Sequence, residues 1–529
     1  MRFPRLSITT HCFVIAFITI ITPGSLLADD WPQWRGPTRN GIANGSDKLP
    51  ETLSKENPPA KVWQSDEVPS DHYGGHGSVI ISKGKVFLSV VWHRDVPTDT
   101  RIIDGNVMGK LGYRSTKFSD ELIAKMEEDR VNLNPRLRGS ALDEWAKNWT
   151  EKNLDEEQRI RLGSWVASRF KKGKTAFAMA DFTKLEPVKS KMFENQAALE
   201  KWVKSQGFDE EVVTRILDAV PDTKKLANDV VLCLDEKTGK TLWKYETEGS
   251  PTGRGSSSTP AISGNKVYAT LSTHLYCVNS DDGSLIWKTP LTGRKGPASS
   301  PLVVDGNVYL QENFLAAFDS ENGKILWTNK EVSGANQSPA SWKSNDSTVI
   351  ICNAAKDVIG VDAETGKTLW KHPGGGDATP TVSGDYLVIA SRLKGHSLSA
   401  YKLSPDAAKQ LWTMDFRTLR YGSSPIIYED HVYHLGSQRH LCINLESGKI
   451  AWERDASSYI SSPVLSDGKL LVYENSGGML TMIKADPEDY TALGQTKVGA
   501  LRCASPAVVG TRLFLRTKDS VVSYDFGGK

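Results

Sequence analysis

The sequence has little cysteine and no excess of charge of either sign. Six cysteines are spread over 529 residues without a CxxC pair, and the net charge is +2 with 24% charged residues. This balance gives no bias toward nucleic acid or membranes, so we predict no nucleic-acid partner. Three cysteines, Cys233, Cys277 and Cys442, lie two residues before a turn Asp or Asn. They are predicted to be buried core thiols, in preference to a disulfide or a metal cluster.

The apolar run near the start, Cys12 to Ile21, is short for a helix that spans a membrane. Arg2 and Arg5 precede it, and Leu26-Leu27-Ala28 offers a small-residue cleavage site. These features predict a signal peptide over residues 1–28, with an uncleaved anchor as the alternative. No lipobox cysteine follows the run. We therefore expect a soluble exported protein, periplasmic or extracellular, without a transmembrane segment after signal removal, and a monomer.

Signatures of catalysis are also missing from the sequence. No Ser-His-Asp or Cys-His arrangement, HExxH motif or phosphate-binding glycine loop can be assigned. The glycine-rich GGGD at Gly374 to Asp377 does not open a helix, so it does not indicate a nucleotide site. These absences favour a protein that binds over one that catalyses.

What the sequence does contain is a repeated hairpin. In VDAETGKTLW, which ends at Trp370, Gly366 supplies the positive φ that a tight turn needs. Similar hairpins recur at steps of about 40 residues. Their tryptophans and turn glycines are Trp243, Trp287, Trp327, Trp370, Trp412 and Trp452, and Gly239, Gly283, Gly323, Gly366 and Gly448. Several short alternating strands in each step predict an all-β propeller of stacked four-stranded sheets.

This hairpin, with its D-x-x-T/S-G-K-x-x-W core, resembles the pyrroloquinoline-quinone-like (PQQ-like) propeller repeat, and WPQWRGPTRNG (Trp31 to Gly41) resembles the start of many secreted bacterial proteins with this repeat. The resemblance covers residues 31–91 and 229–529. Quinoprotein alcohol dehydrogenases carry the repeat, and so does the propeller lipoprotein of the outer-membrane β-barrel assembly machinery. The resemblance therefore implies a fold and leaves enzymatic and non-enzymatic roles open. The dehydrogenases often have a disulfide between adjacent cysteines beside the quinone, and this chain has no Cys-Cys pair.

A Ser/Thr-Pro pair opens most of the innermost strands, and these pairs count the blades. They end at Pro260, Pro301, Pro339, Pro380, Pro425, Pro463 and Pro506, and Ser78-Val79 adds an eighth start. The last blade shows three strands, and Lys61-Val62-Trp63 matches the missing outermost one. We predict an eight-bladed propeller of four-stranded antiparallel blades, closed by this segment. A seven-bladed ring with one stray sheet is the alternative. The repeat tryptophans, Trp63 included, are expected to fill the wedges between sheets.

Blade one is interrupted by a helical insertion over residues 92–228. Residues 29–91 hold the closing strand and the first half of blade one, and residues 229–529 hold the remainder of the propeller. Capping residues and helical periodicity predict four or five helices, in the stretches 119–130, 140–149, 155–170, 195–207 and 209–220. The insertion follows strand two, so it emerges on the face of the blade-to-blade connections, where it would act as a rim or lid.

The blade-to-blade loops are expected to surround the mouth of the central channel. They supply His72, Tyr73, His76, Arg254, Arg294, Asn336, Asp377, Arg420, Tyr459 and Arg502, and the loops after strand two add His93, His274, His396, Arg439 and His440. Three interpretations stay open for this ring. Arginines suit an anionic small molecule or a glycan, and His72 and His76 with His93 or Asp377 could hold a metal. The third interpretation is that the polar groups bond to one another and to water.

Two functions follow from these patterns, and a third is less well supported. The first is a non-catalytic binding or scaffolding protein with an unknown protein, a glycan or a small anionic ligand at the mouth, beneath the insertion. The second is the activity that the resemblance implies, a dehydrogenase of alcohols or sugars that uses PQQ with Ca²⁺. Asp377 is the one acid nominated as its base. The third is a hydrolase or lyase that uses the histidines of the funnel. No cofactor and no metal ligand is assigned from the sequence.

Overall fold

The computed structural model describes residues 30–527 except 44, 46, 56–57, 71–74, 253–256, 292–297, 335, 345–346, 417–422, 457–460, 475–477 and 502–503. The chain forms two compact units. Residues 1–93 and 227–529 belong to the first and Arg94–Leu226 form the second. The predicted signal peptide lies outside the described residues. No helix in the described part of the chain is long and apolar enough to cross a membrane.

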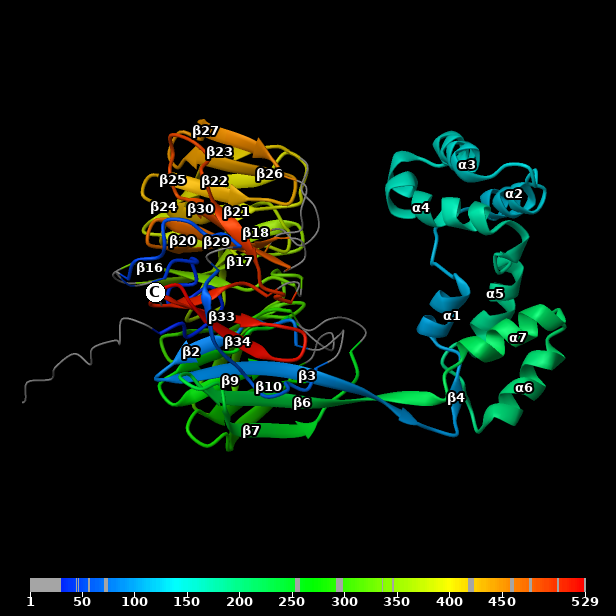
Figure 1. Cartoon of the computed structure of the whole chain (residues 1–529), viewed down its shortest axis with the longest axis horizontal. Coiled ribbons are helices and arrows are strands. Elements are labelled where there is room, and N and C mark those ends of the chain that lie inside the picture. The colour runs from blue at the N-terminus through cyan, green and yellow to red at the C-terminus, as the bar shows by residue number, and fades with distance from the viewer. Residues whose placement is uncertain are drawn as a thin grey trace, which may run out of the picture. The chain divides into compact units, whose positions relative to one another are not determined.

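The first unit contains eight four-stranded sheets, which are the blades of a β-propeller (Figure 1). Blade one consists of β2 (Ile80–Ser82), β3 (Lys85–Pro97), β6 (Thr223–Asp235) and β7 (Thr241–Glu248). Blade two consists of β8 (Ala261–Ser263), β9 (Lys266–Thr270), β10 (His274–Asn279) and β11 (Leu285–Pro290). Blade three consists of β12 (Leu302–Val304), β13 (Asn307–Gln311), β14 (Leu315–Asp319) and β15 (Ile325–Asn329). Blade four consists of β16 (Ala340–Lys343), β17 (Thr348–Asn353), β18 (Asp357–Asp362) and β19 (Thr368–Pro373).

The second half of the ring repeats this order. Blade five consists of β20 (Thr381–Ser383), β21 (Tyr386–Ala390), β22 (Leu398–Ser404) and β23 (Ala407–Met414). Blade six consists of β24 (Ile426–Tyr428), β25 (His431–Leu435), β26 (Arg439–Asn444) and β27 (Ile450–Asp455). Blade seven consists of β28 (Val464–Ser466), β29 (Lys469–Glu474), β30 (Met479–Lys484) and β31 (Ala492–Lys497). Blade eight consists of β32 (Ala507–Val509), β33 (Arg512–Arg516), β34 (Val521–Asp525) and β1 (Ala60–Gln64).

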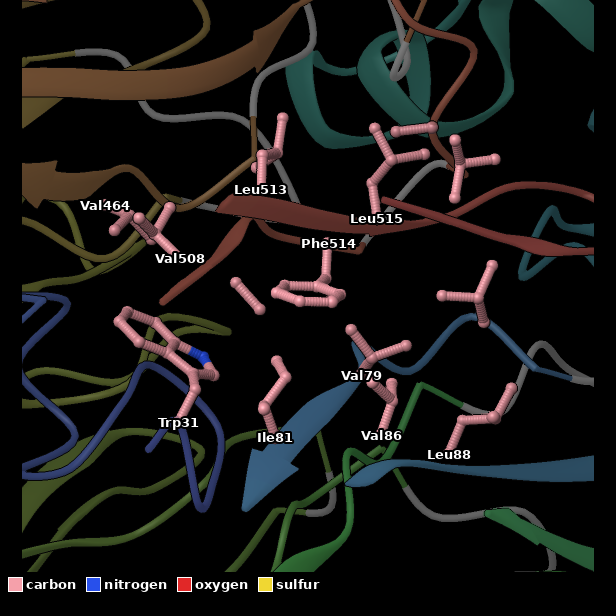
Figure 2. Packing of buried hydrophobic residues seen from close by; sticks show 14 of the residues in the cluster. Trp31, Val79, Ile81, Val86, Leu88, Val464, Val508, Leu513, Phe514 and Leu515 are labelled. Carbon is pink, nitrogen blue, oxygen red and sulfur yellow. The ribbon is translucent and has the colours of Figure 1, made fainter. Parts of the chain in front are cut away.

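The two ends of the propeller sequence meet in blade eight, as predicted. β1 pairs antiparallel with β34, with Lys61 opposite Tyr524 and Trp63 opposite Ser523. The innermost strands β32 and β2 also lie against each other. Figure 2 shows the apolar cluster at this junction, where Trp31 and residues of blade one face Leu513, Phe514 and Leu515 of blade eight. The eight four-stranded sheets agree with the predicted eight-bladed ring, and the edge of the last sheet is covered by β1.

A belt of hydrogen bonds joins the innermost strands. At six of the eight junctions, the Ser or Thr before an innermost strand donates its backbone N–H to the hydroxyl of its counterpart in the next blade. The bonds run from Ser78 to Thr259 (2.9 Å), Thr259 to Ser300 (3.0 Å), Ser300 to Ser338 (2.9 Å), Thr379 to Ser424 (2.9 Å), Ser424 to Ser462 (3.1 Å) and Ser505 to Ser78 (2.9 Å). Each bond satisfies a buried donor that has no strand partner on the channel side.

The repeat tryptophans join the blades further out. Trp243 of blade one lies on Gly283 in the turn of blade two, where an added Cβ would be 2.5 Å from the indole. Five of these indoles donate Nε1–H to a carbonyl in the glycine-containing turn of the next blade. The sixth, Trp452, donates to a carbonyl in a turn that has no glycine. The bonds run from Trp63 to Glu236 (2.8 Å), Trp243 to Ser280 (3.1 Å), Trp287 to Ser320 (3.0 Å), Trp327 to Ala363 (3.1 Å), Trp412 to Leu445 (2.8 Å) and Trp452 to Asp486 (2.8 Å).

The segment from Trp31 to Ala43 lies at the centre of the ring. Its backbone bonds to Ile81 of blade one, Ile262 of blade two and Leu465 of blade seven. Two arginines that are each 2% exposed, Arg35 and Arg39, reach the inner strands of blades three to six. Their Nη groups donate to Thr381 Oγ1 (2.9 Å) and to the carbonyls of Pro425 (2.6 Å), Ser300 (3.2 Å), Pro339 (2.7 Å) and Pro301. One short segment thus contacts blades one to seven.

The second unit contains seven α-helices in the described residues. They are α1 (Gly105–Leu111), α2 (Asp120–Val131), α3 (Gly139–Asn153), α4 (Glu156–Lys172), α5 (Met179–Leu185), α6 (Gln196–Ser205) and α7 (Glu210–Ala219), with short 3-10 turns at Gly173–Thr175 and Glu186–Val188 and a small sheet of β4 (Arg101–Ile102) and β5 (Met192–Phe193). The five predicted helices are α2, α3, α4, α6 and α7. The two additional helices have seven residues each, too few for a clear apolar period.

The strands that lead into and out of this unit are longer than the sequence indicates. β3 continues to Pro97, although its apolar run stops at Val91, and β6 begins at Thr223, ahead of the apolar run from Val230. Half-buried and exposed residues alternate at the outer ends of both extensions, over residues 94–97 and 223–226. The polar and charged residues there hide the strand signal, because pairing continues where neither face is fully buried.

The contact between Trp243 and Gly283 can be tested with Gly283→Ala. Gly283 has φ +74° and Gly264 has φ +63°, but only at Gly264 does an added Cβ meet nothing within 4 Å. Both alanines carry the strain of a left-handed residue, about 1–2 kcal/mol. Gly283→Ala must also displace an indole, and we expect it to lose about 1–3 kcal/mol more in the free energy of unfolding. Urea titrations of the two variants check this, and equal losses would contradict the docking of the indole on this glycine.

The role of the central arginines can be tested with Arg39→Met. The variant keeps most of the side-chain volume but leaves the carbonyls of Ser300, Pro301 and Pro339 without this donor. We expect a loss of about 3 kcal/mol in the free energy of unfolding, because each unsatisfied buried group costs about 1–3 kcal/mol. Arg439→Met, which removes a half-exposed arginine from a surface ion pair, should cost under about 1 kcal/mol. Chemical denaturation followed by tryptophan fluorescence measures both.

Candidate binding site at the channel mouth

The blade-to-blade loops precede the innermost strands and line one end of the ring, here called the mouth. Of the ten residues predicted for it, His76, Asn336 and Asp377 are described. The other seven, His72, Tyr73, Arg254, Arg294, Arg420, Tyr459 and Arg502, lie outside the described residues. His76 is half-buried and lies two residues before Ser78, a member of the hydroxyl belt.

The structure brings two of the predicted residues together. Asn336 lies in the connection between blades three and four, and Asp377 lies in the connection between blades four and five. Asn336 Nδ2 donates to Asp377 Oδ1 at 3.1 Å. The other carboxylate oxygen of Asp377 lies 3.7 Å from Nη1 of Arg392, which follows strand two of blade five. The side chain of Asp377 is 9% exposed. The acid nominated as a catalytic base is therefore held by an amide and a guanidinium.

The predicted histidines after strand two lie in separate contacts. His93 is buried, and its Nε2 accepts the backbone N–H of Thr252 at 3.0 Å. That acceptor role places the ring proton on Nδ1 when the imidazole is neutral. His274 Nδ1 lies 2.8 Å from Thr273 Oγ1. Desolvation, followed by the nearby Lys288 charge, lowers the pKa of His274. His396 is half-buried, and Arg439 lies 3.4 Å from Glu453.

A pair of histidines lies on β25 and β26, and only one of them, His440, is predicted from the sequence. His440 Nε2 lies 3.9 Å from Glu474 Oε1, and burial lowers the pKa of His440, so the contact joins a carboxylate to a largely neutral imidazole. His434, which the sequence analysis missed, is 4% exposed. Burial, followed by the nearby His440, lowers the pKa of His434 to about 4. The signal was the break in apolar alternation at HVYHL, where a histidine occupies a core position.

The fit of this mouth to a quinone with Ca²⁺ can be judged from the donors it offers. Among the residues that the structure describes, no three His, Cys, Asp or Glu side chains lie close enough together to hold a metal ion. Calcium needs six to eight oxygen ligands, several of them carboxylates. In the described part of the mouth Asp377 is already bound by Asn336 and Arg392. The described residues of the mouth therefore do not fit a quinone with Ca²⁺.

The four described free cysteines, Cys233, Cys277, Cys352 and Cys442, are all buried. Burial raises the pKa of the thiols of Cys233 and Cys277 to about 12 and that of Cys442 to about 11. At neutral pH they are protonated and unreactive, as core thiols are. They take no part in the chemistry of the mouth.

Eight four-stranded blades around a centre that the chain itself fills define a β-propeller of the PQQ-like repeat class. Comparison of sequences agrees with this geometry. The family described as "Outer membrane protein assembly factor BamB" matches residues 227–404 and 396–527. The chain belongs to this family.

Individual relatives are distant and of different activities. BamB of Yersinia pestis is 24% identical over 268 residues, which are 47% of this chain and 65% of the relative. Tetrathionate hydrolase of Acidithiobacillus ferrooxidans is 25% identical over 206 residues, 32% of this chain and 41% of the relative. Quinohemoprotein alcohol dehydrogenase ADH IIB of Pseudomonas putida is 30% identical over 115 residues, 18% of this chain and 17% of the relative. The chain thus spans less than two thirds of each of these proteins.

Solved structures show the same spread. BamB of Moraxella catarrhalis has a TM-score of 0.47 at 17% identity, and the match covers 57% of this chain and 89% of the BamB chain. Quinohemoprotein alcohol dehydrogenase of Comamonas testosteroni has a TM-score of 0.43 at 14% identity and covers 57% of this chain and 73% of its own.

The buried His434 makes stability depend on pH. An unfolded histidine titrates near 6.5, whereas His434 in the folded protein titrates near 4. The unfolded state therefore takes up the proton first, and stability falls as the pH drops from 6.5 to 4. The contribution of this residue is up to about 3 kcal/mol. His434→Phe should flatten this part of the curve of unfolding free energy against pH, while His431→Gln on the same strand keeps it. Parallel curves for His434→Phe and the wild type would contradict the assignment.

Proposed function

We propose that this protein is an exported, non-catalytic binding or scaffolding propeller that holds a partner at the channel mouth. The observation that carries the proposal is the state of Asp377, whose carboxylate is bound by Asn336 and lies beside Arg392. A general base needs a free lone pair directed at its substrate, and this acid has neighbours at both oxygens. A carboxylate held in this way offers a fixed polar group suited to recognition.

The names of the relatives support the same function. Several are called outer membrane protein assembly factors, a name that refers to the assembly of outer membrane proteins. We infer a partner protein of the bacterial envelope for this chain, with the periplasm as its location. A small anionic ligand or a glycan at the mouth is the other form of the same binding function. The role of the helical unit as a rim or lid, and the monomeric state, stay predictions from the sequence.

A dehydrogenase that uses PQQ with Ca²⁺ is the alternative function, favoured by the relative from Pseudomonas putida. The purified protein should retain no quinone after incubation with PQQ and Ca²⁺, and it should reduce no dye with alcohols or sugars as substrates. Equilibrium dialysis and a dye assay measure the two quantities. Retained quinone together with dye reduction would overturn the scaffold proposal in favour of the enzyme.

The position of the partner can be tested by photo-crosslinking in the exporting cell. A crosslinking amino acid at Lys394, an exposed residue after strand two of blade five, reports on the mouth. The same amino acid at Lys48, whose side chain is 86% exposed and bonds Asp467 in a turn at the opposite end, is the matched control. We expect one defined adduct from position 394 and none from position 48. Adducts at both positions, or at position 48 alone, would contradict a partner at the mouth.

A further inference from the structure

Arg516 is a buried cation with unused hydrogen-bond donors. It is the last residue of β33, at the mouth end of blade eight, and is 1% exposed. Its Nη1 donates to the carbonyl of Thr517 at 2.7 Å and to that of Ser520 at 2.9 Å. Among the described residues, Nε and Nη2 find no acceptor at all.

This pattern sets Arg516 apart from the other buried arginines. Among the described residues, four other arginines also leave Nε without an acceptor, but none of them has an unpartnered Nη group: Arg35, Arg39, Arg169 and Arg512. In Arg516 both Nε and Nη2 are unused. These two N–H groups are parallel along one edge of the planar guanidinium, and together they can bind two oxygens of one carboxylate or sulfate.

The charge of Arg516 also lacks a partner. Burial lowers the pKa of Arg516 to about 10, so the guanidinium is charged at neutral pH. Asp519 favours the charge from a distance, but no carboxylate among the described residues lies within 4.0 Å of the guanidinium. A buried charge without an ion pair is costly unless an anion or water completes its bonds.

The loop that precedes β2 comes close to Nη2 of Arg516. Gly75, with φ +88°, lies in the loop that precedes β2, and a Cβ there would be 3.4 Å from Arg516 Nη2 and 3.2 Å from Ser70 Oγ. Val68, earlier in the same loop, donates its N–H to the carbonyl of Asp519 at 2.7 Å. The glycine therefore keeps a side chain away from the unused side of the guanidinium, at the junction of blades eight and one.

We propose that Arg516 is the anchor of an oxyanion subsite at the mouth, and that it binds a carboxylate or sulfate group side-on through Nε and Nη2. The subsite deepens the binding function proposed above and rests on it, since it gives the chemical class of what the mouth receives. Neither the repeat pattern nor the ring of predicted mouth residues includes Arg516.

Calorimetric titration of the full-length mature protein with sodium sulfate and with sodium acetate, at constant ionic strength set by chloride, tests the proposal. We expect saturable binding to the wild type and a loss of about tenfold or more in the association constant in Arg516→Gln. Arg516→Lys should lose a similar amount, because it keeps the charge but not the fork. Lys518→Gln removes an equal charge from an exposed site in the same turn and should bind as the wild type does.

Several outcomes would overturn the subsite. Equal binding by the wild type and Arg516→Lys would show that a diffuse charge suffices, and equal losses in Lys518→Gln and Arg516→Gln would show the same. No saturable binding of either anion by the wild type would also reject it. If Arg516→Gln does not fold, selenate soaked into wild-type crystals gives the answer directly, with anomalous density expected beside Nε and Nη2 and a contradiction if it occurs only elsewhere.

The two proposals fail in different ways. Loss of the subsite with a crosslink still formed at position 394 would leave the binding function standing without its anionic ligand. Anion binding by the wild type without any crosslink at the mouth would leave a small-molecule site and remove the partner protein. A peptide rich in Asp and Glu, used as a competitor in the titration, separates a free anion from an acidic side chain as the source of the carboxylate.

Discussion

The interaction on which the ring depends is the binding of two guanidinium groups by backbone carbonyls at its centre. Arg35 and Arg39 are buried, and neither forms an ion pair with a carboxylate among the described residues. Their acceptors are chiefly backbone carbonyls, including those beside the innermost strands. Burial lowers the pKa of both arginines to about 9, so both stay charged at neutral pH. Carbonyl dipoles from several blades share each charge, and a blade that moved outward would leave a cation partly unsolvated.

Outside this centre the ring is held by contacts between neighbouring blades, and most of the contacts made by the repeat tryptophans depend on a turn glycine. Five indoles lie where a side chain at the turn glycine of the next blade would have to be, and their N–H groups find a carbonyl in the same turn. Trp370 is the exception. The turn of blade five, between Ser404 and Ala407, has no glycine. This indole packs on Gly360 of its own sheet, and its Nε1 lacks an acceptor among the described residues.

Much of this architecture could be predicted because it is periodic. The turn glycines, the tryptophans and the Ser/Thr-Pro pairs each recur with the blade, and β1 was recognised as the missing outer strand since Trp63 occupies the repeat position. What occurs once could not be predicted this way. Arg35 and Arg39 lie in a segment with no repeat to compare, and their acceptors are carbonyls, which every residue has. In the sequence, the hydroxyl residues before the innermost strands indicate only where each blade begins. The structure shows that they also form the belt of hydrogen bonds between blades.

The same contrast explains where recognition can reside. The last residue of strand two has one position in the ladder of each blade, yet it is Gln311 in blade three, Asn353 in blade four and Arg516 in blade eight. Gln311 and Asn353 bond to carbonyls of their own and neighbouring blades, so their polarity is used within the fold. Arg516 keeps two donors and a charge in reserve. A repeated backbone thus supplies equivalent positions, and at Arg516 the fold leaves a charge and two buried donors available to a ligand.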